Sequence, residues 1–149
     1  MTKELGIGII GTGFMGKAHA FAYRAALAAF PDIPVPRLEM IADVDHGIAS
    51  TAAKQYGFAR ATTDWRALVS DPGIDVVSIT TPNVFHKEMA LAAIAAGKHV
   101  HCEKPLSPSL SDSLIMVEAA KKAPPIKMAE IGHKELMRVM TAAGYEVVA

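Results

Sequence analysis

Short apolar runs rich in β-branched residues alternate with alanine-rich stretches along this chain, and this alternation is the strongest constraint on its fold. Nearly unbroken apolar runs are typical of strands covered on both faces, and the longer stretches between them are typical of helices. The repeated strand–helix–strand order predicts a doubly wound, mostly parallel sheet in a single three-layer α/β/α domain. The predicted strands are residues 5–10, 38–42, 76–80 and 99–102, with a weaker one near 59–62.

Three helices are predicted between or after these strands, at residues 14–28, 84–96 and 111–122. The first contains an apolar stripe at helical spacing, made of Phe14, Ala18, Phe21, Ala22 and Ala25. We expect this stripe to pack on the sheet. Asn83 is the expected N-cap of the second helix, and Gly97 stands where a C-terminal glycine belongs.

Two proline-rich segments interrupt the alternation. Residues 31–36 are predicted to be a loop that lengthens the first crossover, and Pro124-Pro125 ends the third helix. The tail that follows is predicted to add a strand, a helix and a strand at residues 126–131, 133–143 and 145–149. We therefore expect residues 1–123 to form the main body and residues 124–149 to complete the same sheet.

The glycines Gly11, Gly13 and Gly16 lie between the first predicted strand and helix, with Thr12, Phe14 and Met15 between them. In this context the pattern predicts a dinucleotide site. The first glycine permits a tight turn, the second lets a pyrophosphate approach the backbone, and the third lets helix and strand pack closely. The phosphates would lie on the free N–H groups of the helix N-terminus. The alternative is a tight turn that binds no ligand.

Asp43 ends the second predicted strand, 27 residues after Gly16. The usual spacing of the ribose-binding acid is about 20 residues, and the loop at 31–36 accounts for the excess. A carboxylate here accepts ribose hydroxyl protons and repels a 2′-phosphate. No Lys or Arg follows directly, so we predict NAD in preference to NADP. The alternative is a helix cap, for which Asp45 is the better candidate.

Polar residues also follow the next strand, at the sheet edge where ligands bind in open α/β folds. Thr81, Pro82 and Asn83 are predicted to contact the cofactor, although Asn83 has its capping role as an alternative. His86 falls in the first turn of the following helix, and we expect it to support the site from behind.

Glu103-Lys104-Pro105 directly follows the last of these strands. Charges placed there must emerge at the strand end, since burying them would be costly. Lys104 is the predicted catalytic residue, able to exchange a proton with a substrate hydroxyl. We expect Glu103 to hold a ribose hydroxyl and orient the lysine, and Pro105 to fix the loop, for which a cis peptide is one means. The alternative is an ordinary surface ion pair.

Composition excludes several other classes. The 15 Lys and Arg balance the 15 Asp and Glu, so no basic patch for nucleic acid or anionic membrane is expected. The apolar runs are shorter than the roughly 18 residues of a membrane span, and no signal peptide is evident. With Cys102 as the single cysteine, no internal disulfide forms and a cytoplasmic location is expected. No metal site is predicted.

Together these residues resemble the Gfo/Idh/MocA family of oxidoreductases, named after glucose–fructose oxidoreductase, inositol dehydrogenase and a rhizopine-catabolism protein. The resemblance covers about residues 4–123, and the segment from Ala96-Gly97-Lys98-His99-Val100 to Glu103-Lys104-Pro105-Leu106 is its most specific part. It also includes Asp64-Trp65, Asp75-Val76-Val77, Thr81-Pro82-Asn83 and His86.

The resemblance implies an N-terminal Rossmann domain that binds NAD, with Lys104 as the catalytic or substrate-orienting residue. It implies hydride transfer to or from a sugar or polyol hydroxyl. The family's second domain, which contacts substrate and forms the oligomer interface, has no match in this sequence. We therefore expect a cofactor-binding unit that is weak or inactive alone. The alternative is a non-catalytic dinucleotide sensor or partner-binding module. Open strand edges leave a homo-oligomer as a further expectation.

Overall fold

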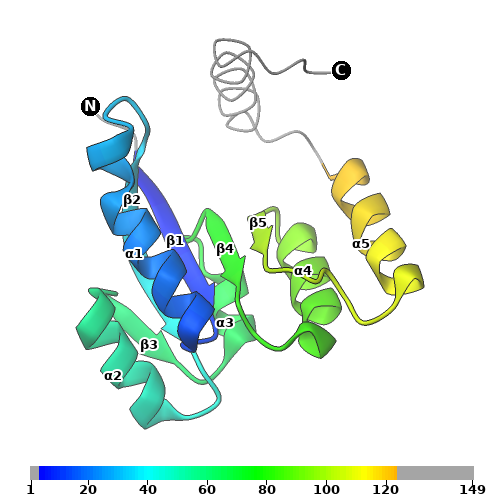
Figure 1. Ribbon diagram of the computed structural model, residues 1–149, viewed down its shortest axis with the longest axis horizontal. Coiled ribbons are helices and arrows are strands. Elements are labelled where there is room, and N and C mark those ends of the chain that lie inside the picture. Colours follow the sequence, from blue (N-terminus) through cyan, green and yellow to red (C-terminus); the bar gives the residue numbers. More distant parts are fainter. Residues whose placement is uncertain (1–3, 124–149) are drawn as a thin grey trace.

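A parallel sheet organises the computed structural model, which describes residues 4–123 (Figure 1). The strands are β1 (Glu4–Ile10), β2 (Val35–Ala42), β3 (Arg60–Thr62), β4 (Val76–Ile79) and β5 (His99–Cys102). Their order in the sheet is β3-β2-β1-β4-β5, and each neighbouring pair is parallel. The order reverses at β1, so the chain winds first toward β3 and then toward β5. The predicted doubly wound parallel sheet is confirmed.

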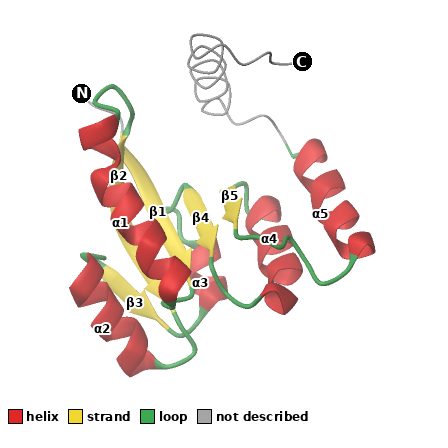
Figure 2. Ribbon diagram, viewed as in Figure 1, coloured by secondary structure: helices red, strands yellow, loops and turns green. Residues whose placement is uncertain are grey.

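Helices cover both faces of this sheet (Figure 2). They are α1 (Phe14–Ala29), α2 (His46–Tyr56), α3 (Trp65–Ser70), the short 3-10 helix η1 (Asn83–Phe85), α4 (His86–Ala95) and α5 (Leu110–Lys122). Helices α2 and α3 are not among the three predicted ones. Each begins at an aspartate that accepts a backbone N–H: Asp45 accepts from Ile48, as expected, and Asp64 accepts from Arg66.

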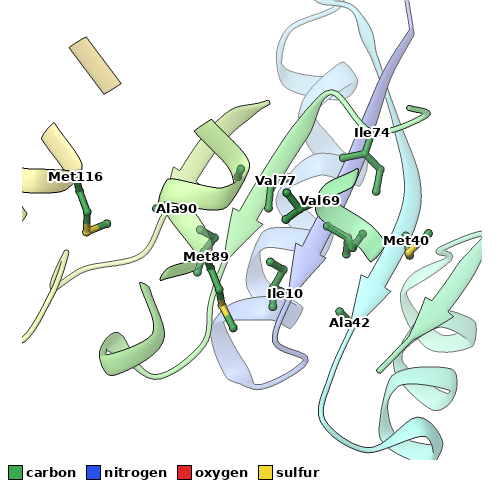
Figure 3. Packing of buried hydrophobic residues seen from close by; sticks show 12 residues of the cluster. Ile10, Met40, Ala42, Val69, Ile74, Val77, Met89, Ala90 and Met116 are labelled. Atoms are coloured by element: carbon green, nitrogen blue, oxygen red, sulfur yellow. The ribbon is translucent and has the colours of Figure 1, made fainter. Parts of the chain in front are cut away.

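The two helical layers bury separate apolar clusters on the two faces. Ile7 and Ile9 of β1 point toward α1 and α2, whereas Ile10 belongs to the cluster formed with α3 and α4. Figure 3 shows this second cluster, in which Met89 of α4 lies near Ile10. The sheet is thus covered on both faces, which is why its strands lack the polar alternation of a one-sided sheet.

Helix α1 buries a different face from the predicted one. Phe14 and Phe21 of the expected stripe are 86% and 48% exposed. The helix instead buries Gly16, His19 and Ala20. Hydrophobic periodicity fails here because the buried face includes His19 and Tyr23, which make hydrogen bonds to Glu103 after β5 and to Ser78 on β4.

The Pro-rich loop is shorter than predicted, because β2 begins at Val35 and includes Pro36. Pro36 pairs with Leu5 of β1, but β3 reaches only Met40 to Ala42 on the other side. This part of β2 therefore has an open edge, where a missing N–H breaks no ladder hydrogen bond.

The predicted N-cap at Asn83 is wrong. Asn83 begins η1 without a side-chain capping bond, and α4 begins three residues later at His86. Gly97 has the expected left-handed conformation, with φ of 72°. The three elements predicted at residues 126–131, 133–143 and 145–149 lie outside the described residues. Within residues 4–123, none of the helices has the length and apolar character of a membrane span.

Candidate cofactor-binding site

A cleft of about 530 Å³ opens at the carboxyl edge of the sheet, where β1, β2 and β4 end. Six of the predicted cofactor-binding residues line it: Gly11, Thr12, Gly13, Asp43, Thr81 and Pro82. The other predicted residues, namely Phe14, Met15, Gly16, Asn83, His86, Glu103 and Lys104, are not part of its lining. The cleft therefore joins the glycine turn to the ends of two neighbouring strands.

The three glycines of the turn have distinct environments. Gly11 has φ of 101°, a left-handed conformation that side chains disfavour. A Cβ on Gly16 would lie 2.1 Å from the Gly11 carbonyl oxygen, so only glycine lets α1 approach β1 this closely. A Cβ on Gly13 would meet nothing within 4 Å. Gly13 therefore faces open space at the start of α1, which has no side-chain cap.

Asp43 connects the end of β2 to the glycine turn. Its Oδ2 accepts hydrogen bonds from the Thr12 N–H, at 3.0 Å, and from the Thr12 hydroxyl. Its Oδ1 accepts the Val44 N–H at 2.8 Å. The carboxylate lies in the cleft lining and also orders the turn, while Asp45 caps α2. Asp45, and not Asp43, is therefore the cap of α2.

The threonine hydroxyls after β4 make internal bonds. Thr80 Oγ1 lies 3.0 Å from the carbonyl oxygens of Ile10 and Gly11, and Thr81 Oγ1 lies 3.5 Å from the Met89 sulfur. Thr80 therefore holds the ends of β4 and β1 together. The Asn83 side chain is half-buried and makes no hydrogen bond with any residue in the described part of the chain.

His86 connects two loops at this edge. Its ring is 1% exposed, with Nε2 2.8 Å from the Thr81 carbonyl oxygen and Nδ1 3.1 Å from the Pro105 carbonyl oxygen. The ring lies behind the cleft lining, as expected, and ties the loop after β4 to the loop after β5.

Glu103 and Lys104 follow β5 at the same carboxyl edge. Glu103 contacts α1, with Oε1 2.9 Å from His19 Nε2, and its Oε2 accepts the Lys104 backbone N–H at 3.1 Å. The hydrogen bond from His19 is the main reason that the Glu103 pKa is lowered. Among residues 4–123, the Glu103 carboxylate and the Lys104 ammonium form no ion pair. The Lys104-Pro105 peptide is cis.

The alternative of a surface ion pair at Glu103-Lys104 is therefore wrong, because Glu103 turns inward to a buried histidine. Glu103 contacts Lys104 through the backbone N–H of residue 104.

The model of the oxidoreductase family with an NAD-binding Rossmann fold, GFO_IDH_MocA, matches residues 5–130. The chain belongs to this family.

The chain is also similar in sequence to individual dehydrogenases. Levoglucosan dehydrogenase of Pseudarthrobacter phenanthrenivorans is 41% identical over 144 residues, which are 96% of this chain and 37% of the relative. Inositol 2-dehydrogenase of Acidothermus cellulolyticus is 35% identical over 119 residues, 80% of this chain and 33% of the relative. The chain thus spans about a third of the length of these relatives.

Solved structures of family members have the same fold. An NAD-binding oxidoreductase from Klebsiella pneumoniae is 52% identical, with a TM-score of 0.77 over 80% of this chain and 32% of that one. Levoglucosan dehydrogenase in complex with NADH and levoglucosan is 45% identical, with a TM-score of 0.79 over 81% of this chain and 33% of that one. The Rossmann fold that the sequence predicts is therefore confirmed.

In this Gfo/Idh/MocA chain, sequence reasoning missed the apolar walls of the cleft, which are formed by Val44, Trp65, Phe85 and Met89. Trp65 has the Arg66 guanidinium 4.2 Å from its ring centre, and Arg66 also pairs with Glu88 of α4. The sequence does hold a signal for these walls: Val44 and Phe85 are apolar residues shortly after strand ends, where a solvated loop would favour polar side chains. Both are exposed in the structure.

Proposed function

We propose that this chain binds NAD in the cleft, as the cofactor unit of a dehydrogenase that oxidises a hydroxyl of a sugar or polyol. One observation carries the proposal: the glycine turn, Asp43 and the loop after β4 line a single cleft, and Lys104 follows β5 at the same edge. Ligands of open α/β folds bind at this edge, near the strand where the order reverses. The names of the relatives support the substrate class.

The pyrophosphate is placed at the N-terminus of α1. Open space at Gly13 leaves room for it against the backbone, and no side chain caps the helix. The first N–H groups of α1 and the helix dipole favour an anion there. Phe14, Met15 and Gly16 provide this first turn, and the close packing at Gly16 fixes its direction.

The adenosine ribose is placed at Asp43, whose carboxylate accepts hydroxyl protons and repels a 2′-phosphate. The residues Val44 and Asp45 supply no cation for such a phosphate. NAD is therefore preferred to NADP. The apolar walls at Trp65 and Phe85 suit an adenine ring.

Bound NAD supplies the hydride acceptor. A substrate carbon would give its hydride to this acceptor while its hydroxyl proton would pass to the Lys104 amine, so that the alcohol would become a carbonyl. Asn83 and Glu103 hold the nicotinamide side of the cofactor, with His86 keeping the two loops together.

Two features of organisation belong to the same proposal. Residues 1–123 act as the cofactor-binding unit, and residues 124–149 complete the sheet beside β5, whose outer edge has no partner strand within residues 4–123. Since the chain spans about a third of its relatives, we expect binding with weak or no turnover from this chain alone. One cysteine and a nicotinamide cofactor favour the cytoplasm.

The test is a calorimetric titration of the chain with NADH and with NADPH, followed by turnover on a panel of sugars and inositols with Lys104→Ala as the control. Tighter binding of NADH than NADPH, and turnover that disappears in Lys104→Ala, support the proposal. Absence of heat with both cofactors contradicts it. Binding together with turnover that Lys104→Ala leaves unchanged refutes the role of Lys104.

A further inference from the structure

A cluster of polar side chains lies beneath α1, against β4 and β5, where apolar packing would be expected. It consists of His19, Tyr23, Ser78, His101 and Glu103. His19 is 7% exposed and Ser78 is fully buried, whereas His101 at the edge of the cluster is exposed. Burying polar groups in this way is costly unless each finds a partner, so the contacts within the cluster show what it holds in place.

The two members on α1 are His19 and Tyr23, one helical turn apart on the same face. The Tyr23 hydroxyl lies 2.8 Å from the Ser78 Oγ on β4. His19 stacks on His101 of β5, with ring centres 4.5 Å apart, and its Nε2 lies 2.9 Å from Glu103 Oε1. Helix α1 is therefore attached to the end of β5 through His19.

The partners of the two ring nitrogens indicate which tautomer His19 adopts. An ionised carboxylate only accepts, so Nε2 carries the N–H that Glu103 receives. The other nitrogen, Nδ1, is buried and has no partner among the described residues. A proton on Nδ1 would be a buried donor without an acceptor, whereas a bare nitrogen there leaves only a weakly demanding lone pair.

The same carboxylate reaches the backbone of the next residue. Glu103 Oε1 meets His19, while Oε2 accepts the Lys104 N–H at 3.1 Å. We propose that His19 is a positioning residue: it fixes the Glu103 carboxylate, and through it the backbone at Lys104, at the nicotinamide end of the site. This rests on the proposed function for the roles of Glu103 and Lys104.

The charges around the carboxylate agree with the geometry. The Glu103 pKa is lowered first by the His19 hydrogen bond, and also by the Lys104 N–H and the charge of Lys104, against a raising effect of burial. Removing His19 takes away the largest of these stabilising contacts. The carboxylate is then free to turn away from α1.

The test compares His19→Leu, which removes the donor, with His19→Gln, whose amide nitrogen can replace Nε2. His46→Gln is the matched control, since His46 is an exposed histidine on α2 outside the cluster. The Glu103 carboxyl is titrated by carbon NMR in each protein. We expect its midpoint to rise toward the ordinary glutamate value of about 4.3 in His19→Leu, and to stay low in His19→Gln and His46→Gln.

NADH affinity is measured on the same proteins. We expect about a tenfold loss in His19→Leu, as for one displaced hydrogen bond to a charged group, and recovery to within about twofold in His19→Gln. A merely structural histidine would not be rescued by glutamine in both readouts. A Glu103 midpoint that does not move in His19→Leu overturns the proposal.

A third measurement needs no variant and decides the matter if His19→Leu fails to fold. Nitrogen NMR of the unmodified chain should show His19 protonated at Nε2 and bare at Nδ1. The opposite tautomer overturns the proposal. If the unmodified chain does not bind NADH, the proposed function fails, while the carboxyl titration and the tautomer still report on His19.

Discussion

At the scale of single residues, Asp43 and Asp45 are two neighbouring acids with different roles in the structure. Asp45 accepts the Ile48 N–H and caps α2, whereas Asp43 lines the cleft and holds Thr12. The difference follows from position, because Asp43 ends beside the glycine turn and Asp45 begins a helix. If Asp43 binds the ribose as proposed, the pair separates cofactor binding from helix capping.

Replacing Asp43 by Ala should weaken NADH binding by at least about tenfold, since a charged acceptor of hydroxyl protons is lost. It should also narrow the preference for NADH over NADPH, because the repulsion of the 2′-phosphate is removed. Calorimetric titration with both cofactors measures the two effects.

Asp45→Ala is the matched control. It should lower the free energy of unfolding by about 1 kcal/mol, the usual cost of a lost N-cap, and leave NADH affinity unchanged. Equal losses of affinity in the two variants would mean that Asp43 acts only through the fold.

Cys102 should react slowly with thiol reagents. Burial, and then the negative charge of Glu103, raise its pKa to about 11. Because the folded pKa lies above the ordinary value, the thiol stays protonated at neutral pH and the reactive thiolate appears only as the pH approaches 11. The rate of labelling against pH checks this; rapid labelling of folded chain at neutral pH would contradict it.

At the scale of elements, the turn between β1 and α1 combines a packing contact with an open surface. Gly16 is in contact with the backbone of Gly11, and Gly13 has no neighbour within 4 Å of a Cβ. Two glycines three positions apart therefore differ in whether they can accept a side chain.

Gly16→Ala should destabilise the fold by about 2 kcal/mol or more, because the new methyl group overlaps a backbone oxygen that cannot move aside. Gly13→Ala should keep the free energy of unfolding within about 0.5 kcal/mol and weaken NADH binding at least about tenfold, since the methyl group enters the proposed pyrophosphate position. Denaturant unfolding and calorimetry of both variants make the comparison. Full NADH affinity in Gly13→Ala would rule out that position.

Much of the element order and the glycine turn could be predicted, because both depend on local patterns. The buried face of α1 could not. His19 contacts Glu103, 84 residues away, and Tyr23 contacts Ser78, 55 residues away. The periodicity of apolar residues within one helix gives no information about such distant polar pairs. The apolar walls of the cleft were not predicted for a similar reason. Trp65 and Phe85 are distant in sequence, and the parallel order of the strands brings them to the same cleft.

At the scale of the whole molecule, the sheet formed by residues 4–123 ends at β5. Strand β5 pairs with β4, and no strand within residues 4–123 lies on its other edge. Helix α5 contacts α4 but leaves Leu110 and Leu114 exposed, at 76% and 56%. An uncovered strand edge offers unpaired backbone groups to another segment or another copy.

Deleting residues 124–149 should therefore lower the melting temperature if that segment completes the sheet. A loss of 1 kcal/mol corresponds to about 2–4 °C in a chain of about 150 residues. Calorimetric melting of the full and shortened chains tests it, with size-exclusion chromatography to detect pairing through the exposed edge. An unchanged melt would contradict sheet completion by the tail.

The hydrogen bonds that Asp43 already accepts limit how many more its carboxylate can take. An ionised carboxylate offers about four lone pairs, and three donors already use them: the Thr12 N–H, the Thr12 hydroxyl and the Val44 N–H. A ribose diol would donate two further hydrogen bonds, but only one lone pair of the Asp43 carboxylate is free to accept them. The hydroxyl of Thr12 is the donor most easily spared, because it rotates while the two amides are fixed. If a ribose binds at Asp43 as proposed, its second hydroxyl would therefore replace the Thr12 hydroxyl, which would then be free to face the bound molecule.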